Sequence, residues 1–191
     1  MKDHLISVPT DLVYRVFNLG ATSLVGSEHQ GQKDVMAATW VCPADYDKMS
    51  AVIDSTHFSR KLIEQSGKFV LMLPGKGIVK EVLTLGSVSK NDNPDKLEQS
   101  GAKFFYMDNC PIPLVEGCAA YALFDVIPEE HNEKTYDLFI GKCKAVWVDD
   151  RILDKRGHWH FDESTDHLRT LHYVSGGHFF AIGESMDISL D

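Results

Sequence analysis

The sequence predicts a mainly β protein, an antiparallel barrel with a few helices packed outside it. Strand-like runs outnumber helical ones, and polar turns join them as hairpins. Strands and helices do not alternate regularly, and no GxGxxG motif follows a strand, which argues against a doubly wound nucleotide-binding fold. The length of 191 residues and the 43% hydrophobic content suit a single domain, residues 1–191.

The composition argues against several classes of partner. The net charge is −9 and Lys and Arg do not cluster, which argues against nucleic acid and anionic membrane surfaces. No apolar run suits a signal peptide or a membrane span, so we expect a cytoplasmic protein. The cysteines form no CxxC pair, and we expect buried, reduced thiols at Cys42, Cys110, Cys118 and Cys143.

The first quarter of the chain has the pattern of three strands. Residues 19–27 alternate weakly and predict a strand, and the polar residues 28–33 are typical of a hairpin turn. Small, β-branched and aromatic residues predict a largely buried strand over 35–42, which residues 43–47 end. Residues 49–53 then predict a short strand.

A short helix and a buried strand follow. Residues 54–56 offer three N-cap candidates, and apolar residues at helical spacing predict a helix over 58–65. Gly67 suits the C-cap of this helix. The continuous apolar run 69–73 predicts a buried strand that ends at Pro74.

The middle of the chain is predicted to be an excursion from the sheet. Residues 78–85 have a helical pattern, and residues 91–94 mark a turn. A second short helix is expected over 95–99 with Asn93 as a cap, and a strand resumes over 104–107.

Two long strands and a terminal strand pair complete the pattern. Residues 119–126 and 136–148 predict strands, joined by the polar segment 128–135 as a hairpin loop. After an irregular polar segment, residues 168–182 predict a strand pair around a glycine turn. One face of the second long strand is expected to carry Phe139, Gly141, Cys143, Ala145 and Trp147.

The start of the predicted helix is a candidate phosphate site. Phosphate favours backbone N–H groups, hydroxyls and the positive end of a helix dipole. Hydroxyls come from Ser55, Thr56 and Ser59, and positive charge could come from His57, Arg60 and Lys61. The same pattern is also typical of a capped surface helix without a ligand.

The strand before this helix is a candidate surface for a flat ring. Ala37 and Ala38 are small enough for an aromatic heterocycle to lie against backbone amides. Tyr173 and Phe179, near the end of the chain, could cover such a ring. A plain core strand and core aromatics explain the same residues.

Histidines near the end of the chain suggest a different chemistry. His158 and His160 form an HxH pair that would point to one side of a strand, as in some metal sites. No third ligand has matching spacing, and solvated loop histidines are the favoured explanation of the pattern. The others in this region are His167, His172 and His178.

Four segments, in order, resemble the flavin reductase-like, FMN-binding split-barrel family, close to its flavoredoxin group. DVMAATW (34–40) is similar to the family's N-x-M-T-x-x-W strand, and THFSRKLIEQSGKFVLMLP (56–74) to its R-x-[ST]-x-x-x-I…G-x-F-V-x-N-x-P segment. YDLFIG (136–141) resembles H-x-L-F-I-G, and YVSGGHFFAIG (173–183) resembles Y-x-x-G-x-x-[YF]-x-x-[LI]-G. The matches span about residues 19–183.

The resemblance implies an FMN-binding split barrel of antiparallel Greek-key type, assembled as a homodimer with FMN near the dimer interface. It implies ring contacts from Met36, Ala37, Ala38, Thr39 and Trp40. It implies that the phosphate is surrounded by Ser55, Thr56, His57 and Ser59. The leading hypothesis is therefore an FMN-dependent oxidoreductase of the flavin reductase or flavoredoxin type, with no proton-transfer residue singled out.

Three positions depart from the family pattern. Asp34 replaces a frequent Asn and Ala37 a frequent Thr, so an amide donor and a hydroxyl are lost. Tyr136 replaces a frequent His that the resemblance associates with nicotinamide use, so a protein electron donor is an alternative to NAD(P)H. A non-catalytic FMN electron carrier and a metal-dependent enzyme using the C-terminal histidines are the competing hypotheses.

Overall fold

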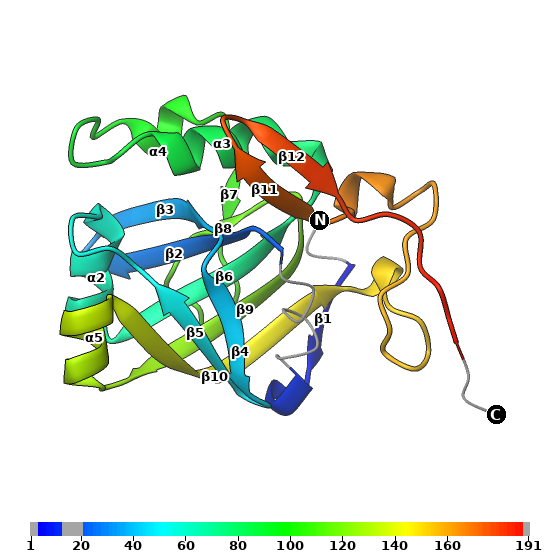
Figure 1. The fold of residues 1–191 in the computed structure, drawn as a ribbon, viewed down its shortest axis with the longest axis horizontal. Helices are drawn as coiled ribbons and strands as arrows, with labels where there is room; N and C mark the ends of the chain where they lie inside the picture. The colour runs from blue at the N-terminus through cyan, green and yellow to red at the C-terminus, as the bar shows by residue number, and fades with distance from the viewer. Residues whose placement is uncertain (1–3, 13–20, 189–191) are drawn as a thin grey trace.

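One eight-stranded antiparallel sheet dominates the computed structural model, which describes residues 4–12 and 21–188 (Figure 1). Its order is β3-β2-β6-β9-β10-β5-β4, with β1 beside β10. The two ends of this path, β3 and β4, are consecutive in the chain, so the sheet curls into a barrel that is not closed. The strands are β1 (Leu5–Val8), β2 (Ser23–His29), β3 (Gln32–Ala38), β4 (Val41–Asp45), β5 (Lys48–Val52), β6 (Lys68–Pro74), β9 (Cys118–Ile127) and β10 (Leu138–Asp149).

Helices and two small sheets lie outside the barrel. The α-helices are α2 (Phe58–Ser66), α3 (Val79–Ser87), α4 (Lys96–Gln99) and α5 (Glu130–Tyr136). The hairpin of β11 (Leu171–Ser175) and β12 (His178–Ala181) lies beside α3, at the top of Figure 1, and the other small pair is β7 (Phe104–Phe105) and β8 (Leu114–Val115). No helix in the described residues is long and apolar enough to cross a membrane. The cytoplasmic location stays a prediction.

The central strands of the sheet are buried on both faces. In β6, Phe69, Leu71 and Leu73 point into the barrel, where they join the core cluster that also holds Phe124 and Phe139. Val70 and Met72 point outward, into a second core under α3 and α4. Burial on both faces explains why residues 69–73 form an unbroken apolar run, as predicted.

The predicted face of β10 is correct only as far as Cys143. Cys143 lies opposite Phe124 and Ala145 lies opposite Leu123, so Lys144 is an extra residue that forms a β-bulge. After the bulge, Val146 and Val148 face the barrel core, whereas Ala145 and Trp147 belong to the outer core. The expected alternation through Ala145 and Trp147 is therefore wrong, because the bulge exchanges the two faces.

The single strand predicted over residues 35–42 is two strands. The chain leaves β3 at Thr39 and Trp40 and begins β4 at the other end of the sheet path. Pro43 does not break the strand, as had been expected, but lies inside β4. A proline is tolerated there because β4 lies at a sheet edge.

Segment 128–135 was predicted to be a hairpin loop, but most of it forms helix α5. An ion pair between Glu130 and Lys134, one helical turn apart, supports this helix, and Asp137 ends it with a left-handed φ of 54°. Residues 104–107 were predicted to form a longer strand than Phe104–Phe105. The free cysteines are buried as predicted at Cys110, Cys118 and Cys143, whereas Cys42 is exposed.

Both predicted turn and cap glycines are confirmed. Gly31 (φ 80°), beside Gln30 (φ 49°), closes the β2–β3 hairpin, and Gly67 (φ 66°) caps α2 and donates to the Ile63 carbonyl. The N-cap of α2 is His57, not one of the predicted residues 54–56. Asp54 instead accepts hydrogen bonds from Thr56 N and Oγ1, at 2.8 and 2.7 Å.

A glycine in β10 makes room for two stacked aromatic rings. Phe69 and Phe124 stack with ring centroids 5.1 Å apart. A Cβ on Gly141 would lie 2.5 Å from Phe69 Cζ and 2.8 Å from Phe124 Cβ. The last residue of the YDLFIG segment must therefore be glycine, because the barrel core has no room for a side chain at this position.

We predict that Gly141→Ala lowers the free energy of unfolding by about 1–3 kcal/mol, because the added methyl overpacks this core. Chemical denaturation of the wild type and the variant measures the change. Gly183→Ala is the matched control, because a Cβ at Gly183 would meet nothing within 4 Å. Equal stability of the two variants would contradict this account of the core.

Candidate functional site

Helix α3 packs against β3, and the two elements form the walls of two adjoining cavities. The closest approach is at Gly86, where an added Cβ would lie 2.9 Å from Ala37 Cβ. The first, the hairpin cavity, has a volume of about 150 Å³ and is lined by Thr22, Ala37, Thr39, Val82, Leu83, Gly86, Ser87, Tyr173 and Phe179. The second, the lysine cavity, has a volume of about 230 Å³ and is lined by Asp34, Met36, Ala37, His57, Phe58, Leu85, Gly86, Ser87, Val88, Ser89, Lys90 and Lys96.

Aromatic side chains of the β11–β12 hairpin form the outer wall of the hairpin cavity. The rings of Tyr173 and Phe179 lie 5.0 Å apart. The backbone N–H of Tyr173 donates to Thr22 Oγ1 at 2.9 Å, and Thr22 N donates to the Leu171 carbonyl at 2.7 Å. These bonds fix the hairpin to the start of β2, so the wall has a defined position beside β3.

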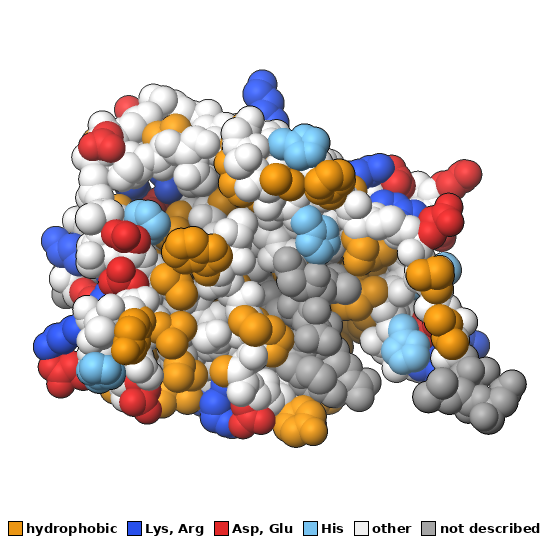
Figure 2. Space-filling view, in the orientation of Figure 1, with side chains coloured by type: hydrophobic (Ala, Val, Ile, Leu, Met, Phe, Trp, Pro, Cys, Tyr) orange, Lys and Arg blue, Asp and Glu red, His pale blue; other side chains and the backbone are white. Residues whose placement is uncertain are grey.

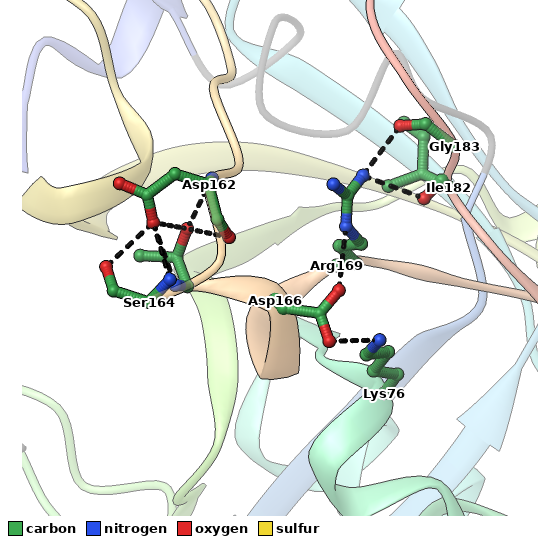
Figure 3. Close-up of polar contacts among 8 residues, drawn as sticks. Lys76, Asp162, Ser164, Asp166, Arg169, Ile182 and Gly183 are labelled. Atoms are coloured by element: carbon green, nitrogen blue, oxygen red, sulfur yellow. Dashed lines mark hydrogen bonds and ion pairs between the residues drawn. The ribbon is translucent and has the colours of Figure 1, made fainter.

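A polar network fixes the same hairpin to the chain segment that leads into α3 (Figure 3). Arg169 donates from Nη1 to the carbonyls of Ile182 and Gly183, at 3.3 and 2.7 Å. Asp166 pairs with Arg169 at 3.0 Å and also with Lys76, which begins the short 3-10 helix before α3. The hairpin and α3, which face each other across the hairpin cavity, are thus anchored to one framework.

A second part of this network shapes the preceding loop. Asp162 Oδ1 accepts from Ser164 N and Oγ, at 2.8 and 2.7 Å, and from Thr165 N at 3.1 Å (Figure 3). These contacts hold the turn before the 3-10 helix Asp166–Leu168. This turn leads directly into Asp166, and neither Asp162 nor Ser164 lines the two cavities.

A buried ion pair forms one wall of the lysine cavity. Lys96 Nζ lies 3.1 Å from Asp34 Oδ1, and the two side chains are 2% and 3% exposed. Ser59 Oγ donates to the other carboxylate oxygen of Asp34 at 2.7 Å. Burial lowers the pKa of Lys96, and the negative charge of Asp34 opposes that effect.

The rim of the lysine cavity adds further positive charge and polar groups. Lys90 Nζ lies 5.4 Å from the centre of the Phe58 ring and donates to the Lys33 carbonyl. Asn91 Nδ2 donates to the Thr56 carbonyl at 2.8 Å, which ties the loop after α3 to the start of α2. The rim therefore combines cations with backbone groups near a helix N-terminus, which suits an anion.

The structure brings four of the nine sequence-predicted site residues to the cavities: Met36, Ala37, Thr39 and His57. The other five lie elsewhere. Ala38 is buried in the barrel core, and Trp40 is 72% exposed. Ser59 is fully buried against Asp34, and Ser55 and Thr56 are exposed in the turn before α2 without lining either cavity.

Arg60 was expected to supply positive charge to a phosphate, but its guanidinium is engaged within the fold. It donates to Glu64 Oε1 at 2.7 Å, to the Ile53 carbonyl and Asp137 Oδ1 at 2.8 Å, and to the Glu133 carbonyl at 2.7 Å. The side chain also lies over the Phe139 ring. Arg60 therefore joins α2 to β5 and α5, and Lys61 beside it is exposed and lines neither cavity.

The C-terminal histidines do not assemble a metal site in the described part of the chain. In residues 4–12 and 21–188, no three His, Cys, Asp or Glu side chains are arranged to hold a metal ion. His158 Nδ1 lies 3.8 Å from Asp154 Oδ2, within a turn held by Asp154. The metal-enzyme hypothesis therefore gains no support from the geometry.

Several cavity residues were not found from the sequence as candidate site residues. Gly86 and Ser87 lie at the end of α3. Their small size, on the helix face toward β3, is the sequence feature that could have marked them as cavity residues. Lys96 lies in α4 beside Leu97, and both are buried. Its role depends on Asp34, which is far away in the sequence, so no local pattern marked it.

The arrangement suits a flat, largely apolar ring that carries an anionic tail. One end offers aromatic and aliphatic walls with the hydroxyls of Thr22 and Thr39, and the other offers Lys96, Lys90 and His57. The two cavities adjoin at Ala37 and Gly86 and together reach the lower end of the range typical of ligand pockets, about 300–1,000 Å³. In their chemistry, these residues fit the ring and the phosphate of a flavin mononucleotide.

Solved structures of other proteins share this fold. The chain aligns with an FMN-binding domain of a flavin reductases-like enzyme from Shewanella baltica OS155, at 38% identity and a TM-score of 0.92, over 97% of both chains. It also shares its fold with flavoredoxin of Desulfovibrio vulgaris (Miyazaki F), at 19% identity and a TM-score of 0.73, over 87% of this chain and 88% of the other. The predicted split-barrel fold is thus confirmed.

Comparison of sequences identifies the family. The protein YddH of Escherichia coli (strain K12) is 31% identical over 184 residues, covering 93% of this chain and 95% of its own. The model of the flavin reductase like domain matches residues 19–188. The chain therefore belongs to the flavin reductase-like domain family.

Proposed function

We propose that this protein binds FMN in the two adjoining cavities and acts as an oxidoreductase of the flavin reductase or flavoredoxin type. The observation that carries the proposal is the pairing of an aromatic hairpin cavity with a lysine-lined cavity on the same strand, β3. Family membership and the FMN-binding domain from Shewanella baltica support it. When bound, FMN would supply the electron-transfer chemistry.

The chain's own residues would bind and orient the ring and limit its contact with water. Gly86 packs directly against Ala37, since a Cβ at Gly86 would lie 2.9 Å from Ala37 Cβ, so the ring would lie beside this contact, in the hairpin cavity. Tyr173 and Phe179 would cover the ring from the hairpin side. Lys96, Lys90 and His57 would hold the phosphate end.

Filling the entrance tests this placement. Ser87 is exposed and lines both cavities, so Ser87→Trp should raise the Kd for FMN at least about tenfold by occupying ligand space. Lys80→Trp is the control, because Lys80 is exposed on the same helix but lines neither cavity. Quenching of flavin fluorescence during titration measures both values. Wild-type protein that neither retains nor binds FMN would refute the proposal, and unchanged binding by Ser87→Trp would refute the location.

A non-catalytic electron carrier is the second candidate function. Tyr136 stands where family members frequently have a His, and its side chain is 60% exposed at the end of α5, lining neither cavity. A reductase would take electrons directly from NAD(P)H, whereas a carrier would be reduced by a protein donor.

Stopped-flow mixing of the FMN form with NADH and NADPH separates the two functions. If the protein is a reductase, the absorbance of the oxidised flavin should be lost within seconds of mixing, because the nicotinamide reaches the bound ring directly. Bleaching by dithionite alone assigns the carrier function. Tyr136→His should accelerate bleaching if this position contributes to nicotinamide use, and an unchanged rate would contradict that role.

We also propose that the protein is a cytoplasmic homodimer. Exposed aromatic residues at the edge of the sheet support the assembly: Trp40 is 72% exposed and Tyr46 66% exposed, at the two ends of β4. Figure 2 shows hydrophobic side chains gathered over β4 and β5 on this face. Such patches are typical of protein interfaces.

Sedimentation analysis tests the assembly. The wild type should sediment as a dimer, and Trp40→Glu should shift it to monomer because a charge at this position would be desolvated in the interface. Tyr106→Glu, at a 42% exposed aromatic outside β4, should leave the dimer intact. A monomeric wild type, or dissociation by Tyr106→Glu alone, would contradict the proposed interface.

A further inference from the structure

The buried ion pair beside the lysine cavity has a consequence for ligand selection. Resting on the proposed function, we propose that Lys96 recognises the phosphate of the ligand and that Asp34 competes with this phosphate for Lys96. The pair would then set the preference of the site for a phosphorylated flavin over the same flavin without phosphate. Neither residue belongs to the phosphate-binding positions that the sequence motifs suggest.

Because both groups of this pair are buried, each charge depends on the other for compensation. Both side chains line the cavity and are 2% and 3% exposed, with Lys96 Nζ 3.1 Å from Asp34 Oδ1. A buried ammonium group needs a counter-charge, because removing either partner leaves an uncompensated buried charge. In the structure described here, Asp34 provides that counter-charge.

Asp34 is only partly satisfied. Its Oδ2 accepts from Ser59 Oγ at 2.7 Å, whereas its Oδ1 is fully buried and accepts no well-aligned hydrogen bond in the described residues. The ion pair with Lys96 is the interaction that holds Oδ1. An anion that takes over Lys96 would therefore leave the buried Asp34 carboxylate without its counter-charge, so the two anions compete for Lys96.

The carboxylate also repels that anion. A phosphate in the cavity would lie near Asp34 as well as Lys96, and the charges of Asp34 and Lys96 cancel before the phosphate arrives. Attraction would then come mainly from Lys90 and His57 at the rim. Replacing Asp34 by the amide Asn keeps its shape and its bond with Ser59 but removes the competing charge.

Titration of FMN and riboflavin into the same variants tests the inference, because riboflavin carries the identical ring without the phosphate. We expect Asp34→Asn to lower the Kd for FMN by about tenfold and to leave the Kd for riboflavin unchanged, because only the phosphate competes with Asp34. Lys96→Met should raise the Kd for FMN by about tenfold or more, again without changing riboflavin. Lys80→Met controls for the loss of one positive charge on the exposed face of α3.

Thermal unfolding with and without FMN provides a second readout. Asp34→Asn should melt at a lower temperature than the wild type without ligand, because Lys96 is left without its counter-charge, and should gain more from added FMN. The double variant Asp34→Asn/Lys96→Met removes both charges, so it tests selectivity in a protein without a lone buried charge. Its preference for FMN over riboflavin should fall below that of Asp34→Asn, because only Lys90 and His57 remain to attract the phosphate.

The outcomes separate this inference from the proposed function. Asp34→Asn that weakens FMN and riboflavin binding by the same factor overturns the inference and makes the pair purely structural, with flavin binding intact. An unchanged ratio of FMN to riboflavin affinity in all variants overturns it in the same way. Wild-type protein that binds neither flavin overturns both proposals.

Discussion

Burial of the central strands on both faces is the constraint on which the rest of the structure depends. Residues of β6 and β9 alternate between the barrel core and an outer core, so the outer face cannot be left to water. The excursion between β6 and β9 covers that face with Val82, Leu85 and Leu97. The contact of α3 with β3, and hence the two cavities, follows from this need to cover the outer face. The polar network around Asp166 and Arg169 then anchors the C-terminal hairpin at the open side of the cavity.

The positive charge of the site is local and does not come from the protein as a whole. The protein as a whole is acidic, with a net charge of −9, so its overall field does not attract a phosphate. Positive charge is instead placed at one end of the cavities, where Lys96 is buried and Lys90 lies at the rim beside the imidazole of His57. Asp34 keeps the buried lysine compensated within the fold. The site therefore combines stability in the free protein with a cation that an anionic ligand can recruit.

The sequence predicted the features that rest on local patterns. Unbroken apolar runs marked strands buried on both faces, Gly31 and Gly67 marked a turn and a cap, and the small size of Ala37 marked the strand wall of the cavities. Features that depend on distant contacts were not predictable in this way. The bulge at Lys144 is seen only in the pairing of β10 with β9, and the polar residues of α5 are held in place by Arg60 from another helix. Lys96 gains its role only when the fold brings Asp34 to it.

A crystal structure of the protein grown with FMN tests the central claim most directly. The account predicts density for the ring between Ala37 of β3 and Tyr173 of the hairpin, with the phosphate beside Lys96 and Lys90. In that state the contact between Lys96 and Asp34 should be lengthened or replaced. Flavin density at another surface, or a phosphate bound at Ser55 and Thr56 with the Asp34–Lys96 pair unchanged, would contradict it.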